Sequence, residues 1–194
     1  MFLYHITEAK TIQTILREGL IPSGSTSRDR EESDLSAAAD KNGISLPVAR
    51  QNSVFCYILF HEVVESLRFD RKIGRKTDLN NGRRGVVVID AEGIKNQLYV
   101  ADFDYFSDII DLKHMKTPDD TIRSESYEDA LINYANSVTP VTEYESVADI
   151  DGEHRITEVL IEDGISASRI EEVIFLEKVD ANAYYSPYPV PPIN

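Results

Sequence analysis

The chain has 194 residues and a formal net charge of −14 at pH 7. It contains no apolar run near the roughly 20 residues that a membrane-spanning helix needs, and its negative charge disfavours broad binding to nucleic acid or anionic membranes. The single cysteine, Cys56, excludes an internal disulfide framework, and no His/Cys cluster has zinc-site spacing. We therefore expect a cytoplasmic globular protein with no membrane partner and no metal.

The N-terminal residues predict a strand, a helix and a glycine exit. Residues 2–6 read as a strand, and Thr7 is placed to cap a helix over about 8–18. Gly19 follows where a left-handed C-cap residue belongs. This strand-helix-glycine unit is the first of two segments on which the functional interpretation depends.

The middle of the chain is harder to assign. Residues 23–43 are mostly polar, which predicts a long mobile loop with a helical turn around 35–40. The pattern then predicts, in order, an extended stretch at 44–48, a polar turn at 50–52, a core strand at 53–60 and a short helix at 61–67.

A basic segment at 68–84 stands out from the acidic chain. It has seven basic and two acidic residues, a net charge of +5, so the remaining residues carry −19. Its central cations are candidate nucleic-acid contacts: Arg71, Lys72, Arg75 and Lys76. A solvated loop that balances the acidic surface is an equally open reading.

The remaining elements mix strands and helices without strict alternation, which favours an α+β fold. We expect a central strand at 85–89 and a strand at 97–103 that pairs with it as a hairpin. Helices are expected at 105–115 and 127–138, an acidic connection at 144–153, and a closing strand at 170–176. Residues 1–180 are expected to form one domain, and residues 181–194 an extended tail rich in proline and tyrosine.

The second key segment begins at Glu158. This carboxylate precedes the apolar run Val159-Leu160-Ile161, which predicts a short buried strand, and the turn Asp163-Gly164 follows. Glu158 is expected half in the core and half in a cleft. We expect this strand to lie beside the N-terminal strand, around a small-molecule site.

The two segments together resemble the ADP-ribosyltransferase superfamily, and most of all its DarT-like branch, which modifies DNA. The N-terminal match is His5-Ile6-Thr7 followed by the exit Gly19-Leu20. The C-terminal match is Glu158 opening its apolar strand, followed by a turn and a further strand. The resemblance covers both ends of residues 1–178 and the middle only loosely.

This resemblance implies two split, twisted sheets that hold NAD+ in the cleft between them. Nicotinamide would leave, and an acceptor would attack the anomeric carbon of the ribose. A fixed carboxylate near that ring stabilises an oxocarbenium-like ribose, a role that falls to Glu158. Arg50 would clamp the diphosphate as the second catalytic residue. His5, Thr7 and Tyr57 would contact NAD+, with Tyr57 stacking on nicotinamide. The acceptor would be a DNA base, with single-stranded DNA the expected partner, or a protein.

Two other functions stay open. An RNA 2′-phosphotransferase-like enzyme would use the same NAD+ cleft with several basic residues for the phosphate. A non-enzymatic binding or inhibitor module would use the acidic surface, and Glu158→Ala would leave its function intact. A nuclease or hydrolase lacks support, because the sequence has no metal-ligand spacing, nucleophile elbow or P-loop.

Overall fold

The computed structural model describes residues 1–22, 29–60, 63, 83–114, 122–153, 156–177 and 186–188. The strands in this part of the chain are β1 Phe2–Glu8, β2 Ser53–Tyr57, β3 Arg83–Asp90, β4 Leu98–Asp102, β5 Thr139–Pro140, β6 Thr157–Glu162, β7 Ile170–Glu177 and β8 Ser186–Tyr188. The α-helices are α1 Ile12–Glu18, α2 Asp29–Lys41, α4 Phe103–His114, α5 Tyr127–Ser137 and α6 Val147–Glu153. Short 3-10 turns occupy Ala9–Thr11, Arg50–Asn52, Lys95–Gln97, Val141–Glu143 and Ala167–Arg169.

The strands form one sheet in the order β5-β4-β6-β2-β1-β3-β7-β8, with antiparallel pairing between neighbours. The centre of the sheet is apolar on both faces, because Val86 to Ile89 of β3 and Val159 to Ile161 of β6 are all buried. A sheet of this kind with helices grouped outside it is an α+β fold, as the sequence predicts.

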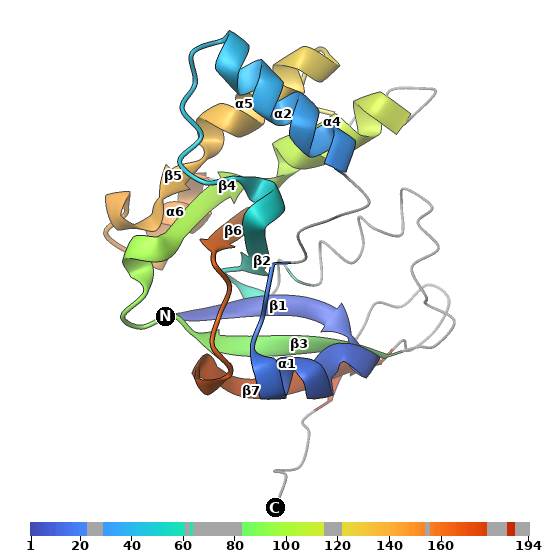
Figure 1. Cartoon of the computed structure of the whole chain (residues 1–194), viewed down its shortest axis with the longest axis vertical. Helices are drawn as coiled ribbons and strands as arrows, with labels where there is room; N and C mark the ends of the chain where they lie inside the picture. Colours follow the sequence, from blue (N-terminus) through green and yellow to red (C-terminus); the bar gives the residue numbers. More distant parts are fainter. Residues whose placement is uncertain are drawn as a thin grey trace, which may run out of the picture.

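The sheet is split between β1 and β2. These two strands share a single register pair, Tyr4 with Tyr57, whereas β1 pairs with β3 along its whole length from Phe2 to Glu8. Figure 1 shows the consequence: β1, β3 and β7 run across the lower part of the molecule, and β2, β4 and β6 turn away from them above. Two half-sheets therefore diverge from one contact point.

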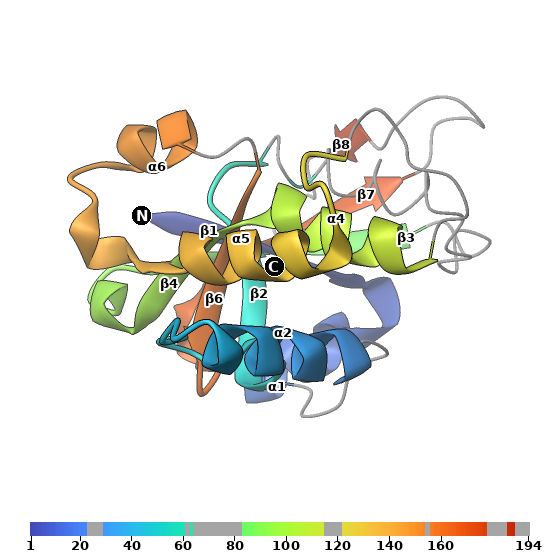
Figure 2. The same cartoon turned by 90° about the horizontal axis from the view of Figure 1, so that it is seen from above.

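Each half-sheet has its own helices. In Figure 1, α2, α4 and α5 gather at the upper end, and α1 lies against the lower half. Figure 2 shows from above that α2 and α5 run side by side over the β4-β6-β2 half. The upper helices bury Phe106, Ile109, Leu131 and Tyr134 against the sheet, and α1 buries Ile12 and Ile15 in a separate cluster.

Most predicted elements are confirmed. The strands predicted at 53–60, 85–89, 159–161 and 170–176 and the helices at 105–115 and 127–138 all form, with small shifts of their ends. Helix α5 begins where its sequence indicates, because the Ser126 side chain accepts a hydrogen bond from the Asp129 backbone N–H at 3.1 Å.

Several predictions are wrong. Residues 29–41 are helix α2 rather than loop, and residues 44–48 form no strand. Helix α2 is easily missed because only Leu35, Ala38 and Ala39 form its buried apolar stripe, while its other described side chains are polar or small. The acidic connection at 144–153 contains helix α6.

The predicted pairings near β3 and β6 are also wrong. Strand β3 pairs with β1 and β7, and β4 pairs with β5 and β6, so β3 and β4 form no hairpin. Strand β2 lies between β1 and β6, so the two key segments are not neighbouring strands. Thr7 lies inside β1 and caps no helix, since α1 begins at Ile12.

Some predictions fall on residues that the structure does not describe. They include the short helix at 61–67 apart from Val63, nearly all of the basic segment, and most of the C-terminal tail. In the described part of the chain, no helix is both long and apolar enough to span a bilayer.

Candidate functional site

The split between β1 and β2 opens into a cleft of about 490 Å³. A volume of this size lies within the ordinary range for small-molecule sites. Its walls come from β1, α1, the exit of α1 and β2, and the residues that line it are His5, Thr7, Thr11, Thr14, Ile15, Glu18, Gly19, Leu20, Ile21, Pro22, Ser53, Val54 and Phe55. The cleft follows from the divergence of the half-sheets beyond Tyr4 and Tyr57.

One wall of the cleft is fixed by a crossing of the two key segments. The backbones of Leu20 and Ile165 pair in both directions, with N···O distances of 2.8 and 2.7 Å. Gly19 and Gly164 have φ of 86° and 84°, and a Cβ on either would overlap a backbone carbonyl of the opposite segment. Only glycine suits both positions, because they need a left-handed backbone and close approach. The N-terminal and C-terminal segments thus meet at this crossing rather than through neighbouring strands.

His5 stands on the β1 wall with its ring orientation fixed. Its Nδ1 lies 2.7 Å from the carbonyl oxygen of Phe55 on β2, which bridges the two half-sheets just beyond their contact point. Burial lowers the pKa of His5, and this outweighs the hydrogen bond to Phe55, which raises it. The imidazole is therefore neutral at pH 7 and can hydrogen-bond a ligand without changing its charge.

Hydroxyl groups extend the polar surface of the cleft. The oxygens of Thr7 and Thr11 lie 2.6 Å apart, and Thr11 donates to the Glu8 carbonyl at 2.8 Å. Ser53 of β2 also borders the cleft, but it lies on the strand face of Tyr57 and Glu158, and its hydroxyl donates to the Ala49 carbonyl at 3.0 Å. Glu18 contributes the carboxylate of the lining, and it pairs with Arg17 at 2.6 Å.

The two residues predicted to be catalytic, Arg50 and Glu158, are in direct contact inside the helical half. Arg50 donates from Nε and Nη2 to the two carboxylate oxygens of Glu158, at 3.2 and 2.8 Å. It also donates to Glu32 of α2 at 3.2 Å, and Tyr134 of α5 donates its hydroxyl to Glu158 at 2.8 Å. The Arg50 guanidinium lies between two rings, 3.5 Å from the Phe106 centroid and 4.1 Å from that of Phe55.

Burial makes this cluster strongly coupled. The side chains of Arg50 and Glu158 are 5% and 3% exposed. Burial lowers the pKa of Arg50, but Glu158, Tyr134 and Glu32 together outweigh it and raise the pKa, so the guanidinium stays charged. Burial, and next the charge of Glu158, raise the pKa of Tyr134 well above its ordinary value, so the phenol keeps the proton that it donates. The cluster joins β6, α2 and α5 through one cation.

The structure corrects the predicted geometry of the site. Glu158 is buried rather than half in a cleft, and it does not line the cleft that contains His5. Register explains the separation: Tyr4, Tyr57 and Glu158 are cross-strand partners and share one face, so His5, next to Tyr4, points to the other face. Glu158 and His5 therefore do not face each other across a common crevice.

Arg50 and Tyr57 also lie away from the cleft. The Arg50 guanidinium is enclosed by Glu158, Glu32 and aromatic rings, and the side chain is only 5% exposed. Tyr57 packs edge-on against Phe103, with ring centroids 6.2 Å apart. Thr7 does line the cleft, as its predicted ligand role requires.

Sequence reasoning missed two members of the buried cluster, Glu32 and Tyr134. Tyr134 was predicted to face inward, but nothing in its helix indicates that its hydroxyl meets Glu158. Glu32 lies in the helix that was read as loop. If residues 29–41 are assigned as an amphipathic helix, Glu32 lies next to its apolar stripe, and that position indicates that Glu32 approaches the core.

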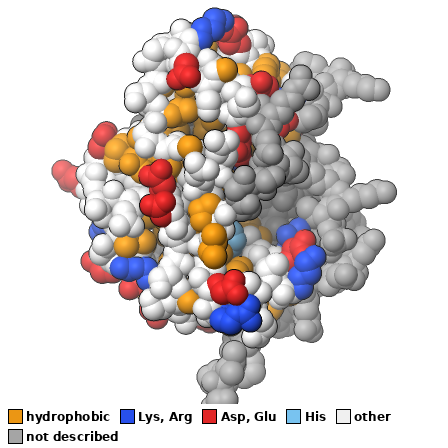
Figure 3. Space-filling model, viewed as in Figure 1, with side chains coloured by type: hydrophobic (Ala, Val, Ile, Leu, Met, Phe, Trp, Pro, Cys, Tyr) orange, Lys and Arg blue, Asp and Glu red, His pale blue; other side chains and the backbone are white. Residues whose placement is uncertain are grey.

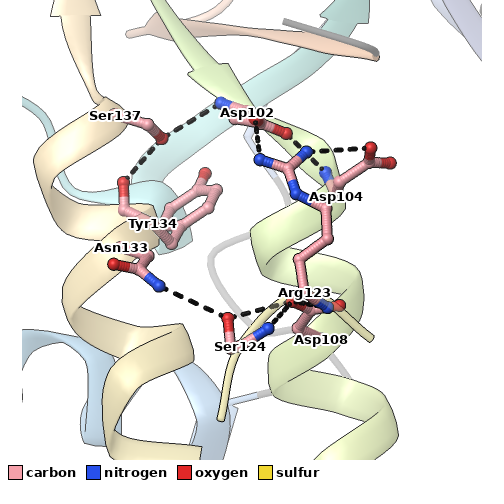
Figure 4. Close-up of polar contacts among 8 residues, drawn as sticks. All are labelled: Asp102, Asp104, Asp108, Arg123, Ser124, Asn133, Tyr134 and Ser137. Atoms are coloured by element: carbon pink, nitrogen blue, oxygen red, sulfur yellow. Dashed lines mark hydrogen bonds and ion pairs between the residues drawn. The ribbon is translucent and has the colours of Figure 1, made fainter. Parts of the chain in front are cut away.

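A second polar cluster fastens the segment before α5 to α4, and Figure 4 shows it. The Asp108 carboxylate accepts from the backbone N–H groups of Arg123 and Ser124, at 3.0 and 2.9 Å, and from the Ser124 hydroxyl at 2.9 Å. The Arg123 guanidinium pairs with Asp102 and Asp104, both at 3.1 Å. These bonds position the N-terminus of α5, and hence Tyr134, over the sheet.

The face of the molecule in Figure 3 shows no nucleic-acid footprint among its described side chains. Among the described side chains on the face in Figure 3, acidic and basic groups are scattered, with no continuous basic stripe. The predicted contacts Arg71, Lys72, Arg75 and Lys76 lie outside the described residues. Within the described ranges, no three His, Cys, Asp or Glu side chains are placed to hold a metal ion.

Comparison with known proteins finds a distant likeness to a solved structure. No family model matches the chain, and no curated protein matches it in sequence. A solved structure named EcPltA aligns with 97% of this chain and 82% of its own length, at 13% sequence identity and a TM-score of 0.45. A likeness this distant supports no statement about activity.

Proposed function

We propose that this protein is an NAD+-dependent ADP-ribosyltransferase that binds NAD+ in the cleft between β1 and β2. The observation that carries the proposal is the cleft itself. It opens where the sheet splits, and His5, Thr7, Gly19 and Leu20 line it. These are the residues on which the resemblance to ADP-ribosyltransferases rests, and a split sheet around an NAD+ cleft is what that resemblance implies.

The reaction is a substitution at the anomeric carbon of the nicotinamide ribose. The bond from that carbon to the nicotinamide nitrogen breaks, and its electron pair leaves with nicotinamide. A bond then forms from the carbon to an acceptor nucleophile, whose proton passes to a base. The chain must stabilise the positive charge that develops on the ribose between these events.

Two carboxylates, Glu18 and Glu158, are candidates for stabilising the positive charge on the ribose. Glu18 lines the cleft and is 46% exposed, so it can approach a bound ribose directly. Glu158 is the residue that the resemblance selects, but it is held by Arg50 and Tyr134 on the other face of the sheet. Under our proposal Glu18 supplies the field at the ribose, and Glu158 holds the helical half in place through Arg50.

The acceptor is a macromolecule, with a DNA base first and a protein second. The resemblance favours DNA, and the basic segment at 68–84 is the part of this acidic chain suited to phosphate. An RNA 2′-phosphotransferase would need the same basic segment to reach the cleft, because no lysine or arginine is among the described residues that line it.

A second candidate function is a non-enzymatic acidic binding module. The hydrogen bonds of Glu158 inside the core favour this alternative. A carboxylate bonded to Arg50 and Tyr134 can have a purely structural role that needs no ligand. Under this alternative, substitution of Glu158 changes stability, and no variant changes nicotinamide release, because none occurs.

The test is incubation of the purified protein with labelled NAD+ and, separately, single-stranded DNA, RNA and lysate protein. Nicotinamide release and label transfer are measured for wild type, Glu18→Gln, Glu158→Gln and the exposed control Gln13→Ala. We expect transfer by wild type and the control, and a loss on the order of 10²-fold for Glu18→Gln.

The outcomes separate the possibilities. Absence of nicotinamide release and of label transfer with every acceptor contradicts the enzyme and leaves the binding module. A Glu158→Gln variant that folds normally and loses all transfer, beside an active Glu18→Gln, would return the catalytic role to Glu158. Unfolding curves of each variant distinguish lost chemistry from a lost fold.

A further inference from the structure

Helix α2 buries little apolar surface. Its buried apolar side chains are Leu35, Ala38 and Ala39, and the other buried residues described in this helix are the carboxylates Glu31 and Glu32. Helix α4, by comparison, buries two phenylalanines and two isoleucines in the same core. Because apolar stabilisation grows with the area removed from water, α2 gains much less from burial than α4 does.

Polar contacts supply much of the attachment of α2. Arg50, in the turn before β2, donates to Glu32 at 3.2 Å. Asp34 accepts from Lys113 of α4 at 2.9 Å and from the Tyr127 hydroxyl of α5 at 2.8 Å. These bonds act over a short range, so they are lost together if α2 moves away, and water can then solvate the groups that they release.

The inner side of α2 borders a small cavity. Its volume is about 10 Å³, close to what a single water molecule needs. Helix α2 contributes Glu32, Leu35 and Ser36 to the lining, and Arg50 and Tyr134 lie on the other side. Atoms beside a void lose the dispersion contacts that close packing would supply, so the attachment of α2 is weaker than that of a fully packed helix.

The connection from α2 to β2 provides a hinge. The Ile44 N–H donates to the Ala39 carbonyl at 2.9 Å, so the C-terminal cap belongs to the same unit as the helix. The Ala49 carbonyl accepts from the Asn52 N–H at 3.0 Å, which fixes the other end of the connection beside β2. Residues 45–48, between these two anchors, make no backbone hydrogen bond to another described residue.

We propose that α2 is a hinged cover over the buried pair of Arg50 and Glu158, and that it opens on residues 45–48 while the rest of the domain stays folded. In the closed arrangement, Glu32 of α2 occupies one edge of the Arg50 guanidinium. Opening releases Glu32 and leaves the bonds from Arg50 to Glu158 intact, since neither residue belongs to α2. Elements that admit a ligand are drawn from the least stable parts of a fold, and α2 has that character. This inference concerns a motion of the fold and holds whether or not the protein uses NAD+.

The experiment is amide hydrogen exchange of the wild-type protein, followed by mass spectrometry at rising concentrations of urea below the unfolding transition. We expect the amides of α2 to exchange about tenfold or more faster than those of α5, and with little dependence on urea, because local opening exposes little new surface. The exchange of α5 should rise steeply with urea, because it requires unfolding of the domain. Equal rates and equal urea dependence in the two helices would overturn the proposal.

Two variants test the contact that holds the cover closed. Glu32→Gln keeps the shape of the side chain but weakens the bond to Arg50, and it should speed the exchange of α2 about tenfold without changing that of α5. Asp40→Asn removes an exposed carboxylate from the same helix and should change neither. An unchanged exchange of α2 in Glu32→Gln, or an equal acceleration of α2 and α5, would contradict a cover held by Glu32. No NAD+ enters these measurements, so their outcome is separate from that of the transferase assay.

Discussion

Replacing Arg50 with methionine should cost more stability than any other loss of a single charge among the described ion pairs. The guanidinium is 5% exposed and is the described cation that Glu158 and Glu32 share. Methionine has a similar length and fills the space between the Phe55 and Phe106 rings. The substitution therefore removes the charge and its donors while largely keeping the packing.

The expected loss of stability follows from the buried negative charge that Arg50→Met leaves in the core. Arg50 makes two bonds to Glu158 and one to Glu32, and its loss leaves the Glu158 carboxylate buried without this cation. Removing one partner of a buried ion pair costs about 3–5 kcal/mol. In a domain of this size, that corresponds to a fall in Tm of roughly 6–20 °C. Tyr134→Phe, which removes one hydrogen bond to Glu158, should cost less, about 1.5–3 kcal/mol.

Urea and thermal unfolding measure these differences directly. The matched control is Lys41→Met, which breaks an exposed ion pair with Glu128 and should change stability by less than about 1 kcal/mol. The double variant Arg50→Met with Glu158→Gln should recover part of the loss, because it removes the buried negative charge that Arg50 had neutralised on Glu158. A loss below about 1 kcal/mol for Arg50→Met alone would refute the buried cluster as the link between sheet and helices.

Three further predictions concern other parts of the fold. Gly164→Ala should lower the free energy of unfolding by about 2 kcal/mol or more, since its Cβ would overlap the Leu20 carbonyl. Gly43→Ala, at a φ of 68° but in open space, should cost only about 1–2 kcal/mol. Equal losses in urea unfolding would contradict the crossing of the two segments. Ser126→Ala should cost about 1 kcal/mol through loss of the α5 cap, and an unchanged urea midpoint would argue against that cap. Because burial lowers the pKa of His5, the unfolded state binds more protons than the folded state below pH 6.5, so the free energy of unfolding is largest above that pH and falls as the pH drops toward the lowered pKa. Urea unfolding at pH 7.5 and 5.5 should show a smaller pH dependence of stability in His5→Asn than in wild type. An equal pH dependence in the two proteins would contradict this prediction.

Local patterns in the sequence identified most of the elements whose signal is strong. The β-branched run at 85–89 and the apolar run after Glu158 form central strands because they have no polar side to expose. Helix α2 was missed because its apolar stripe is short. Its charged residues form ion pairs with partners far away in the chain, such as Asp34 with Lys113. A pattern of residue types within one segment cannot contain such partners.

The sequence by itself determined that this is an α+β chain, that Gly19 and Asp163-Gly164 are turns, and that Arg50, Glu158, His5 and Thr7 are the polar residues to follow. Only the tertiary structure decided how these residues are divided between two places. Strand β2 inserts between β1 and β6, and the alternation of side chains along paired strands then directs Glu158 into the helical core and His5 to the cleft. Strand order and register depend on contacts between distant segments, whereas the turns and apolar runs depend on neighbours in the chain.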